Sequence, residues 1–452
     1  MKDNLTKHKK GSVRELWALS YPMVLAFLSG NLMLFVDRLF LANYAIDAMN
    51  AAVASGMVAI VFQYGAATIA SISVVFVGQF NGAREYKKVG SPAWQMLWFS
   101  AAMQIIFMCI GLWAGPYLLP QYHYESYGLP YFQWMFYFGA ATPAIAALIG
   151  FFIGIGKTTY VMIISIIGNF INILFDIILI FGVKGVLEPM GTKGAAIGTG
   201  ISLIIQLILF LSIFLSHKYR QKYGTAIWRF DLGLFLRCAK IGVPSALGHM
   251  IEWGAWAVSL RLMAEVGDIY LTVATVGLSI YMLVIFGFEG VQKAVTTIAS
   301  NCIGAENYDG VWVAWRSGIK LLLISAVPLG IVMLGYPQPI ISEFLSKENS
   351  AADLILLTKI LRYTTVGVFI YYILDGFTWI CVGVLTAAQD TWYVMWINAF
   401  TACFCALAPV YIFMVHLQIS PIWYFFLISI YGACNATAFY IRLSIAPWEK
   451  AS

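Results

Sequence analysis

The sequence predicts an all-α membrane protein with twelve transmembrane helices arranged as two six-helix bundles. Of its 452 residues, 61% are hydrophobic and only 11% are charged, whereas about one quarter of the residues of a soluble domain are charged. Apolar runs long enough to cross a bilayer, which takes about 20 residues, follow one another along the whole chain. Short segments of the first half also recur in the second half, which indicates an internal duplication.

The apolar runs are separated by short polar breaks, and each run is interpreted as one membrane span. The predicted spans cover residues 16–43, 51–80, 92–115, 130–154, 159–183, 193–216, 235–264, 271–303, 312–335, 357–387, 392–416 and 421–444. No polar stretch between them is long enough to fold alone, so we expect no soluble domain and expect the membrane bundle itself to carry the function. Its expected parts are an N-lobe at residues 1–216, a cytoplasmic interfacial linker at 217–234 and a C-lobe at 235–452.

The linker has a pattern of its own. The segment Trp228–Arg237 alternates bulky apolar and basic residues. This alternation is typical of a helix that lies in the membrane interface. We therefore expect a short interfacial helix that ties the two lobes together.

The duplication is visible as matching motifs at a fixed offset. Pro22 and Pro244 lie 222 residues apart, and the segments 82–86 and 304–308 resemble each other at the same offset. Six spans per copy is an even number, so both copies have the same orientation in the membrane. Parallel repeats of this kind are a transporter architecture in which the substrate sits between the halves and access alternates as they rock.

The offset grows toward the end of the chain. The segments 157–162 and 390–395 resemble each other at an offset of 233. An insertion of 11 residues between the ninth and tenth spans, near residues 338–352, accounts for the difference.

The chain has a net charge of +6, and the positions of its basic residues indicate its orientation in the membrane. Basic residues precede the first span, follow the second and surround the join between the sixth and seventh. The breaks on the opposite side at residues 45–50, 116–129 and 266–270 contain no Lys or Arg. By the positive-inside rule, we expect a multi-pass protein of the cell (inner) membrane with both termini in the cytoplasm.

The first lobe carries carboxylates inside its spans. Asp37 lies deep in the first span, and Asn172 and Asp176 lie on one face of the fifth, in the i, i+3, i+7 series that begins at Asn169. An ionisable group within a span is costly unless it faces a wet or polar interior. Thr199 in the sixth span reaches the same level. We therefore expect Asp37, Asn172, Asp176 and Thr199 to share one site.

Two coupling chemistries suit this first site. Carboxylate, amide and hydroxyl oxygens suit a hard cation such as Na⁺, which Asp37, Asn172 and Asp176 could hold. A buried pair of carboxylates also holds a proton tightly, which suits H⁺ coupling. The residues alone leave both alternatives open.

The second lobe carries Glu252 in the seventh span and Asp375 in the tenth, both near mid-membrane. Carboxylates among aromatic rings favour an organic cation, through charge pairing and cation–π contact. The candidate substrate contacts, each one helical turn from an acid, are His249, Trp256, Tyr371, Tyr372 and Trp379.

Four further charged residues lie in the predicted spans and need not belong to either acidic site. Glu289 and Lys293 lie at i, i+4 and can neutralise one another. Arg38 and Arg261 could pair with a carboxylate or meet an anionic substrate. If they bind an anion, the protein could instead be a flippase for a lipid-linked precursor; a third hypothesis is a non-transporting membrane receptor or scaffold.

Catalytic and nucleotide-binding motifs are missing from the sequence. The triplet Gly156-Lys157-Thr158 lacks the glycine that a phosphate-binding loop needs at position 151, which is Phe151. The seven cysteines have no metal-site spacing. We expect a protein that is not an enzyme, with no cofactor besides the coupling cation, no nucleic acid partner and no obligate protein partner. Its expected partners are membrane lipids and a small-molecule substrate.

Several motifs resemble the MATE (multidrug and toxic compound extrusion) transporters, and the pair Glu252 and Asp375 resembles the NorM branch. The matching motifs are Pro22 with Phe35-Val36-Asp37, residues 78–83, Asn172 to Asp176 before residues 180–182, residues 194–199, Pro244 with Glu252, and Asp375 followed by residues 389–391. Arg38 and Thr386-Ala387-Ala388 depart from the family pattern and indicate a divergent branch.

This resemblance implies two six-helix bundles that form a V around a central cavity. The implied activity is export of organic cations or drugs in exchange for Na⁺ or H⁺. It also implies a coupling site at Asp37, Asn172, Asp176 and Thr199, and a coupling or substrate site at Glu252 and Asp375.

Overall fold

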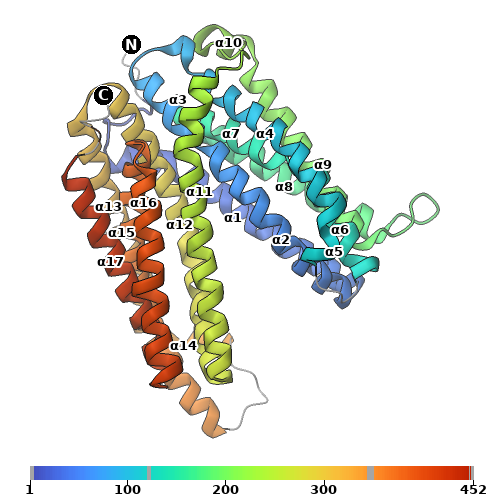
Figure 1. Ribbon diagram of the computed structural model, residues 1–452, viewed down its shortest axis with the longest axis vertical. Helices are drawn as coiled ribbons and strands as arrows, with labels where there is room; N and C mark the ends of the chain where they lie inside the picture. Colours follow the sequence, from blue (N-terminus) through green and yellow to red (C-terminus); the bar gives the residue numbers. More distant parts are fainter. Residues whose placement is uncertain (1–4, 120–123, 344–350, 447, 449–452) are drawn as a thin grey trace. The chain divides into compact units, whose positions relative to one another are not determined.

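The computed structural model describes residues 5–119, 124–343, 351–446 and 448. Helices joined by short connections make up this part of the chain (Figure 1), and its one β-type pairing is an isolated bridge between Val183 and Leu187. The prediction of an all-α membrane protein is confirmed.

The chain divides into two compact units. The first comprises the residues up to Lys7, Ala18–Ala246 and Ser300–Asn307, and the second comprises His8–Trp17, Leu247–Ala299 and Tyr308 onward. The lobe boundaries expected at residues 216 and 234 stay a prediction.

The first half of the chain contains the helices α1 (Val13–Tyr44), α2 (Ile46–Ser71), α3 (Ser73–Gly82), α4 (Ser91–Cys109), α5 (Gly115–Leu118), α6 (Leu129–Tyr137), α7 (Ala141–Gly154), α8 (Thr158–Phe181), α9 (Gly191–Phe214) and α10 (His217–Tyr223). Short π-helical turns at Ile110–Ala114 and Tyr124–Gly128 extend α4 and α6. Helices α8 and α9 run side by side (Figure 1).

The second half contains α11 (Leu232–Val266), α12 (Asp268–Gly304), α13 (Tyr308–Gly330), α14 (Gln338–Glu343), α15 (Ala351–Ala387), α16 (Thr391–Thr401) and α17 (Tyr424–Ser444). Two π-helical segments, Ala402–Leu407 and Val410–His416, continue α16. In the second unit α15 packs against both α13 and α17 (Figure 1). The expected insertion near residues 338–352 lies partly outside the described residues.

The predicted spans coincide with helical segments. Ten described helices are long and apolar enough to cross a membrane, and the bent pair Ser126–Tyr137 and Ala141–Gly154 makes an eleventh. The remaining predicted span falls on α11, which is 35 residues long but interrupted by charged side chains, Glu252 among them. Its length of about 52 Å at 1.5 Å per residue is more than a bilayer requires.

The segment Trp228–Arg237 is helical only in its second half, where residues 232–237 begin the long helix α11, so it does not form a separate short helix. Residues 224–231 are not helical, and α11 begins at Leu232. The reason is that Gln95 of α4 takes the backbone groups that a helix would use: it donates to the carbonyl of Arg229 at 3.1 Å and accepts from the amide of Asp231 at 3.0 Å. Asp231 in turn caps α11 by accepting from the amide of Leu234 at 3.1 Å.

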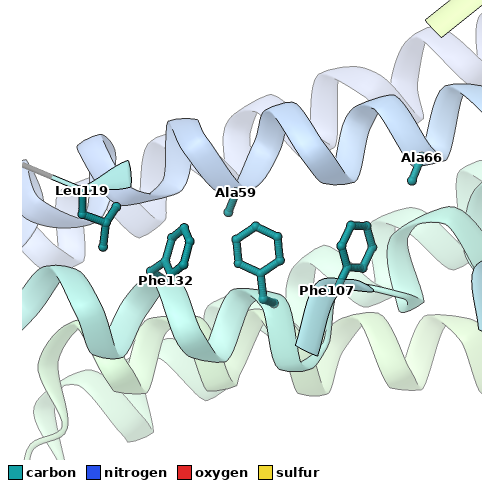
Figure 2. Close-up of a cluster of buried hydrophobic side chains, with 6 residues drawn as sticks. Ala59, Ala66, Phe107, Leu119 and Phe132 are labelled. Carbon is teal, nitrogen blue, oxygen red and sulfur yellow. The ribbon is translucent and has the colours of Figure 1, made fainter. Parts of the chain in front are cut away.

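The interior of the first unit is built from small residues on one helix and aromatic rings on others. Figure 2 shows Phe107 and Phe132 facing α2, which presents Ala59 and Ala66 to them. Leu119 and Phe136 also belong to the cluster, and the ring centroid of Phe136 lies 4.7 Å from that of Phe132. Alanines leave room for the rings, so the helices can pack closely.

Both copies of the repeat contribute to one close helix contact. Gly82 ends α3 and Gly304, at the 222-residue offset, ends α12. A Cβ atom on Gly82 would collide with the carbonyl oxygen of Asn301, and one on Gly304 would collide with that of Gln79. Small residues allow such backbone approach in membrane helices. The Asn81 amide also donates to Oδ1 of Asn301 at 2.7 Å.

This contact yields a stability prediction. Replacing Gly304 with Ala should lower the thermal unfolding midpoint in detergent, because the added methyl group meets backbone that cannot rotate away; overpacking of this kind costs about 1–3 kcal/mol. Gly254→Ala is the matched control, since a Cβ at this helical glycine has open space. Equal midpoints for the two variants would contradict the proposed packing.

Candidate functional site

The first acidic cluster consists of Asp37, Asn172, Asp176 and Thr199, all in the first unit. Helix α1 supplies Asp37, α8 supplies Asn172 and Asp176, and α9 supplies Thr199. Asn172 and Asp176 are fully buried, and Asp37 is half-buried. The structure therefore brings together the four residues that the sequence places in one site, while their roles stay a prediction.

Asn172 is the centre of this cluster. With its amide oriented to suit its neighbours, Nδ2 donates to Oδ1 of Asp37 at 3.0 Å. Its Oδ1 accepts from Oγ1 and the amide nitrogen of Thr199 at 3.3 and 3.2 Å. Asn172 thereby connects the first span to the sixth.

The two carboxyl groups of the cluster also contact each other. Asp37 and Asp176 are joined by a side-chain hydrogen bond. A hydrogen bond between two carboxyl groups requires one of them to carry a proton. The remaining oxygen of Asp176, Oδ1, is buried with no hydrogen-bond partner in the structure. A buried orphan oxygen beside a second carboxylate can accept a proton or a small cation.

Tyr131 also belongs to the first acidic cluster, although it is not among the site residues predicted from the sequence. This tyrosine of α6 interacts electrostatically with Asp37 and Asp176, and its ring lies against Gly56 of α2. Its position near the outer end of the fourth span, at the level of Asp37, was the available signal. Asn169, by contrast, lies outside the cluster and donates to Oγ of Ser29 at 2.8 Å, so its role in the structure is to join α8 to α1.

The second acidic cluster surrounds Asp375 in the second unit. Asp375 of α15 is 3% exposed, and its Oδ2 accepts from Oη of Tyr281 at 2.5 Å and from Nε1 of Trp379 at 2.8 Å. The sequence predicted Trp379 but missed Tyr281, which stands alone in α12 without a periodic pattern. Two donors on one oxygen stabilise a negative charge there.

Aromatic rings extend from Asp375 toward Glu252. Trp256 of α11 stacks on Tyr281 with centroids 6.1 Å apart, and Tyr371 lies edge-on to it at 5.9 Å. Glu252 and Trp256 both line a small cavity of about 20 Å³, which is room for roughly one water molecule. The carboxylates thus lie among ring faces, as the sequence predicts.

Two of the predicted substrate contacts, His249 and Tyr372, interact differently from Trp379, which donates directly to Asp375. Nδ1 of His249 lies 3.8 Å from Oε2 of Glu252, which is too long for a hydrogen bond. Its ring lies 6.1 Å from that of Trp379. Tyr372 packs against Phe288 at 4.8 Å, and its hydroxyl meets Oγ of Ser325 at 3.1 Å.

The remaining charged residues separate into different environments. Arg261 lies at an exposed position, where its Nε donates to Oε1 of Glu265 at 3.3 Å. Arg38 is also exposed and interacts electrostatically with Asp37. Glu289 and Lys293 attract each other within the second unit. Among the described residues, no group of three His, Cys, Asp or Glu side chains could hold a metal ion.

A family model for MatE matches residues 22–178 and 244–412. The two matched segments begin 222 residues apart, which is the offset of the sequence repeat. A probable multidrug resistance protein NorM from Mesorhizobium japonicum is 22% identical over 394 residues, covering 84% of this chain and 82% of the relative. One from Thermotoga maritima is 24% identical over 344 residues, covering 75% and 72%.

Solved structures share the fold. A crystal structure of a MATE protein in the straight conformation has a TM-score of 0.85 at 18% identity and covers 98% of both chains. A MOP superfamily transporter from Pyrococcus furiosus, described as having a binding pocket of reversed polarity, has a TM-score of 0.80 at 17% identity and covers 98% of this chain and 97% of its own.

The tight packing around Asp176 gives a test that removes no charged group. A Cβ atom on Gly198 of α9 would collide with Oδ1 of Asp176, so Gly198→Ala should displace this carboxyl group. A strain of about 1–3 kcal/mol would weaken binding of a proton or Na⁺ at the first acidic cluster by roughly tenfold. Calorimetric titration with Na⁺ and measurement of proton uptake check this. Gly30→Ala in α1, where a Cβ has open space, should bind like the wild type; equally weak binding in both variants would refute the prediction.

Proposed function

Since the chain belongs to the MatE family of membrane transporters, we propose that it is a secondary antiporter that exports organic cations in exchange for Na⁺ or H⁺. The observation that carries this proposal is the presence of two acidic clusters inside membrane-spanning helices, one in each unit. Intramembrane carboxylates are costly to maintain and mark ion or substrate pathways.

The two clusters suit different ligands. The first acidic cluster offers carboxylate, amide and hydroxyl oxygens, which suit a small cation or a proton. The second offers Glu252 and Asp375 beside Trp256, Tyr281 and Tyr371. Aromatic faces next to carboxylates favour an organic cation, because each ring adds about 0.5–2 kcal/mol of cation–π attraction when water is excluded.

We propose that coupling operates through exclusion of one cation by another. When Na⁺ or H⁺ loads the carboxylates, their charge is neutralised and the affinity for a cationic substrate falls. This coupling is reciprocal, so the substrate also lowers the affinity for the coupling ion. Rocking of the two parallel repeats would then carry the two ligands in opposite directions. The proposed location is the inner membrane, with both termini in the cytoplasm.

The alternative function, a flippase for a lipid-linked anionic precursor, would use Arg38 and Arg261 as ligands. Arg261 is paired with Glu265 at an exposed site, with 83% of its side chain exposed. In the second unit Glu252 and Asp375 interact with each other, and Glu289 interacts with Lys293, which neutralises it. An excess of acidic groups favours a cationic substrate over an anionic one. A receptor or scaffold role has no support in a family of transporters.

The first test is transport by purified protein in proteoliposomes under an imposed Na⁺ or pH gradient, applied one at a time. One gradient should drive accumulation of a fluorescent organic cation, and the other should have little effect. Uptake of the organic cation at the same rate with and without either gradient would refute the antiporter proposal. Transport that requires an anionic lipid-linked substrate would also refute it.

The second test removes one charge from each cluster. Asp37→Asn and Glu252→Gln should leave membrane insertion intact but reduce gradient-driven transport by at least roughly tenfold, because each loses a carboxylate worth more than about 1.4 kcal/mol of coupling. Glu265→Gln is the control, since this exposed acid ends the same helix as Glu252. Drug resistance at the wild-type level in cells that express the cluster variants would contradict the assigned roles.

A further inference from the structure

The first unit contains a large apolar groove whose lining residues include none of the first acidic cluster. Its volume is about 440 Å³, within the roughly 300–1,000 Å³ of typical ligand sites. Helices α4, α7 and α9 form most of its walls, which include Trp94, Trp98, Ala101, Tyr137 and Leu211. No residue of the second unit lines it.

The surroundings of the groove are those of a lipid-facing surface. On α4, Ile105 is 70% exposed, and on α9, Ile208 is 55% exposed. Both helices are long and apolar enough to cross the membrane. Large apolar side chains exposed at membrane depth are stable only in contact with hydrocarbon. The groove is therefore open to acyl chains.

The segment 224–231 lies at one end of this groove and is held there by the groove's own tryptophans. Nε1 of Trp94 donates to the carbonyl of Thr225 at 2.8 Å, and Nε1 of Trp98 donates to that of Trp228 at 3.0 Å. The rings of Trp98 and Trp228 lie 6.0 Å apart. Trp94 and Trp98 thus belong to the wall of the groove and also hold the segment that leads into α11.

This segment combines apolar and cationic side chains at its surface. Ile227, Trp228 and Phe230 are 54%, 63% and 49% exposed, and Arg229 is exposed between the two aromatic residues. Exposed aromatic residues next to a basic one are typical of a chain that sits at the level of the lipid head groups. The basic residues predict that this interface faces the cytoplasm.

We propose that the groove binds one anionic phospholipid of the cytoplasmic leaflet. Its acyl chain fills the space between α4, α7 and α9, and its phosphate meets the guanidinium of Arg229. Arginine binds phosphate through two parallel hydrogen bonds. The bound lipid fixes segment 224–231 against α4 and thereby stabilises the start of α11.

The acyl-chain part of the proposal is tested by filling the groove. Ala101 is exposed and lines the groove, whereas its neighbour Ala102 is exposed but does not line it. Ala101→Trp should abolish retention of phosphatidylglycerol in native mass spectrometry from detergent micelles. Ala102→Trp, the matched control, should retain one lipid as the wild type does. Equal retention by both variants would overturn the site.

The head-group part is tested with Arg229→Gln, which should bind phosphatidylglycerol roughly fivefold more weakly, the equivalent of about 1 kcal/mol per basic residue at a membrane surface. The matched control Arg220→Gln, at an exposed arginine of α10, should bind phosphatidylglycerol like the wild type.

A second measurement uses the wild type alone. Phosphatidylglycerol should raise its thermal unfolding midpoint more than phosphatidylcholine does. Equal effects of the two lipids, the same stabilisation by inorganic phosphate alone, or displacement of the lipid by a transported organic cation would each overturn the proposal.

Discussion

Carboxyl groups that lie within lipid-embedded helices must find polar partners, and the arrangement of both units depends on this requirement. No water is available in the hydrocarbon to replace a missing partner. In the first unit Asp37 accepts from the Asn172 amide, which in turn accepts from Thr199, and Asp37 and Asp176 are joined by a side-chain hydrogen bond. In the second, Asp375 turns to Tyr281 and Trp379. The contacts Asp37–Asn172 and Tyr281–Asp375 join helices that are far apart in sequence, so these polar groups fix how the helices are rotated.

Small residues let the helices come close enough for these contacts. Gly198 leaves the space that one oxygen of Asp176 occupies, and Ala59 and Ala66 leave space for phenylalanine rings (Figure 2). Gly82 and Gly304 serve the same purpose where α3 meets the end of α12. Because those two glycines are equivalent in the repeat, the duplicated chain uses one packing solution twice.

The two acidic clusters differ in the groups that surround their carboxylates. The first has an amide and a hydroxyl beside its carboxylates, and the second surrounds Asp375 with aromatic hydroxyl and indole donors. This difference is the physical basis for proposing a small coupling ion at one and an organic cation at the other. A third region, the groove beside Trp94 and Trp98, has no carboxylate among its described lining residues, which is why we propose a lipid there and not a cation.

The sequence by itself determined the membrane class, the positions of the spans, the repeat and which helices carry buried charge, because hydropathy and motif offsets are properties of the linear chain. It also placed Asp37, Asn172, Asp176 and Thr199 in one site, since helical rise fixes their depth. Only the tertiary structure decided which side chains contact each other. Tyr281 donates to Asp375, and the hydroxyl of Tyr372 lies against Ser325. Gln95 bonds to the backbone of the segment before α11, which is not helical. These contacts depend on the rotation and tilt of whole helices, which are set by packing between residues distant in sequence and leave no periodic trace in any one of them.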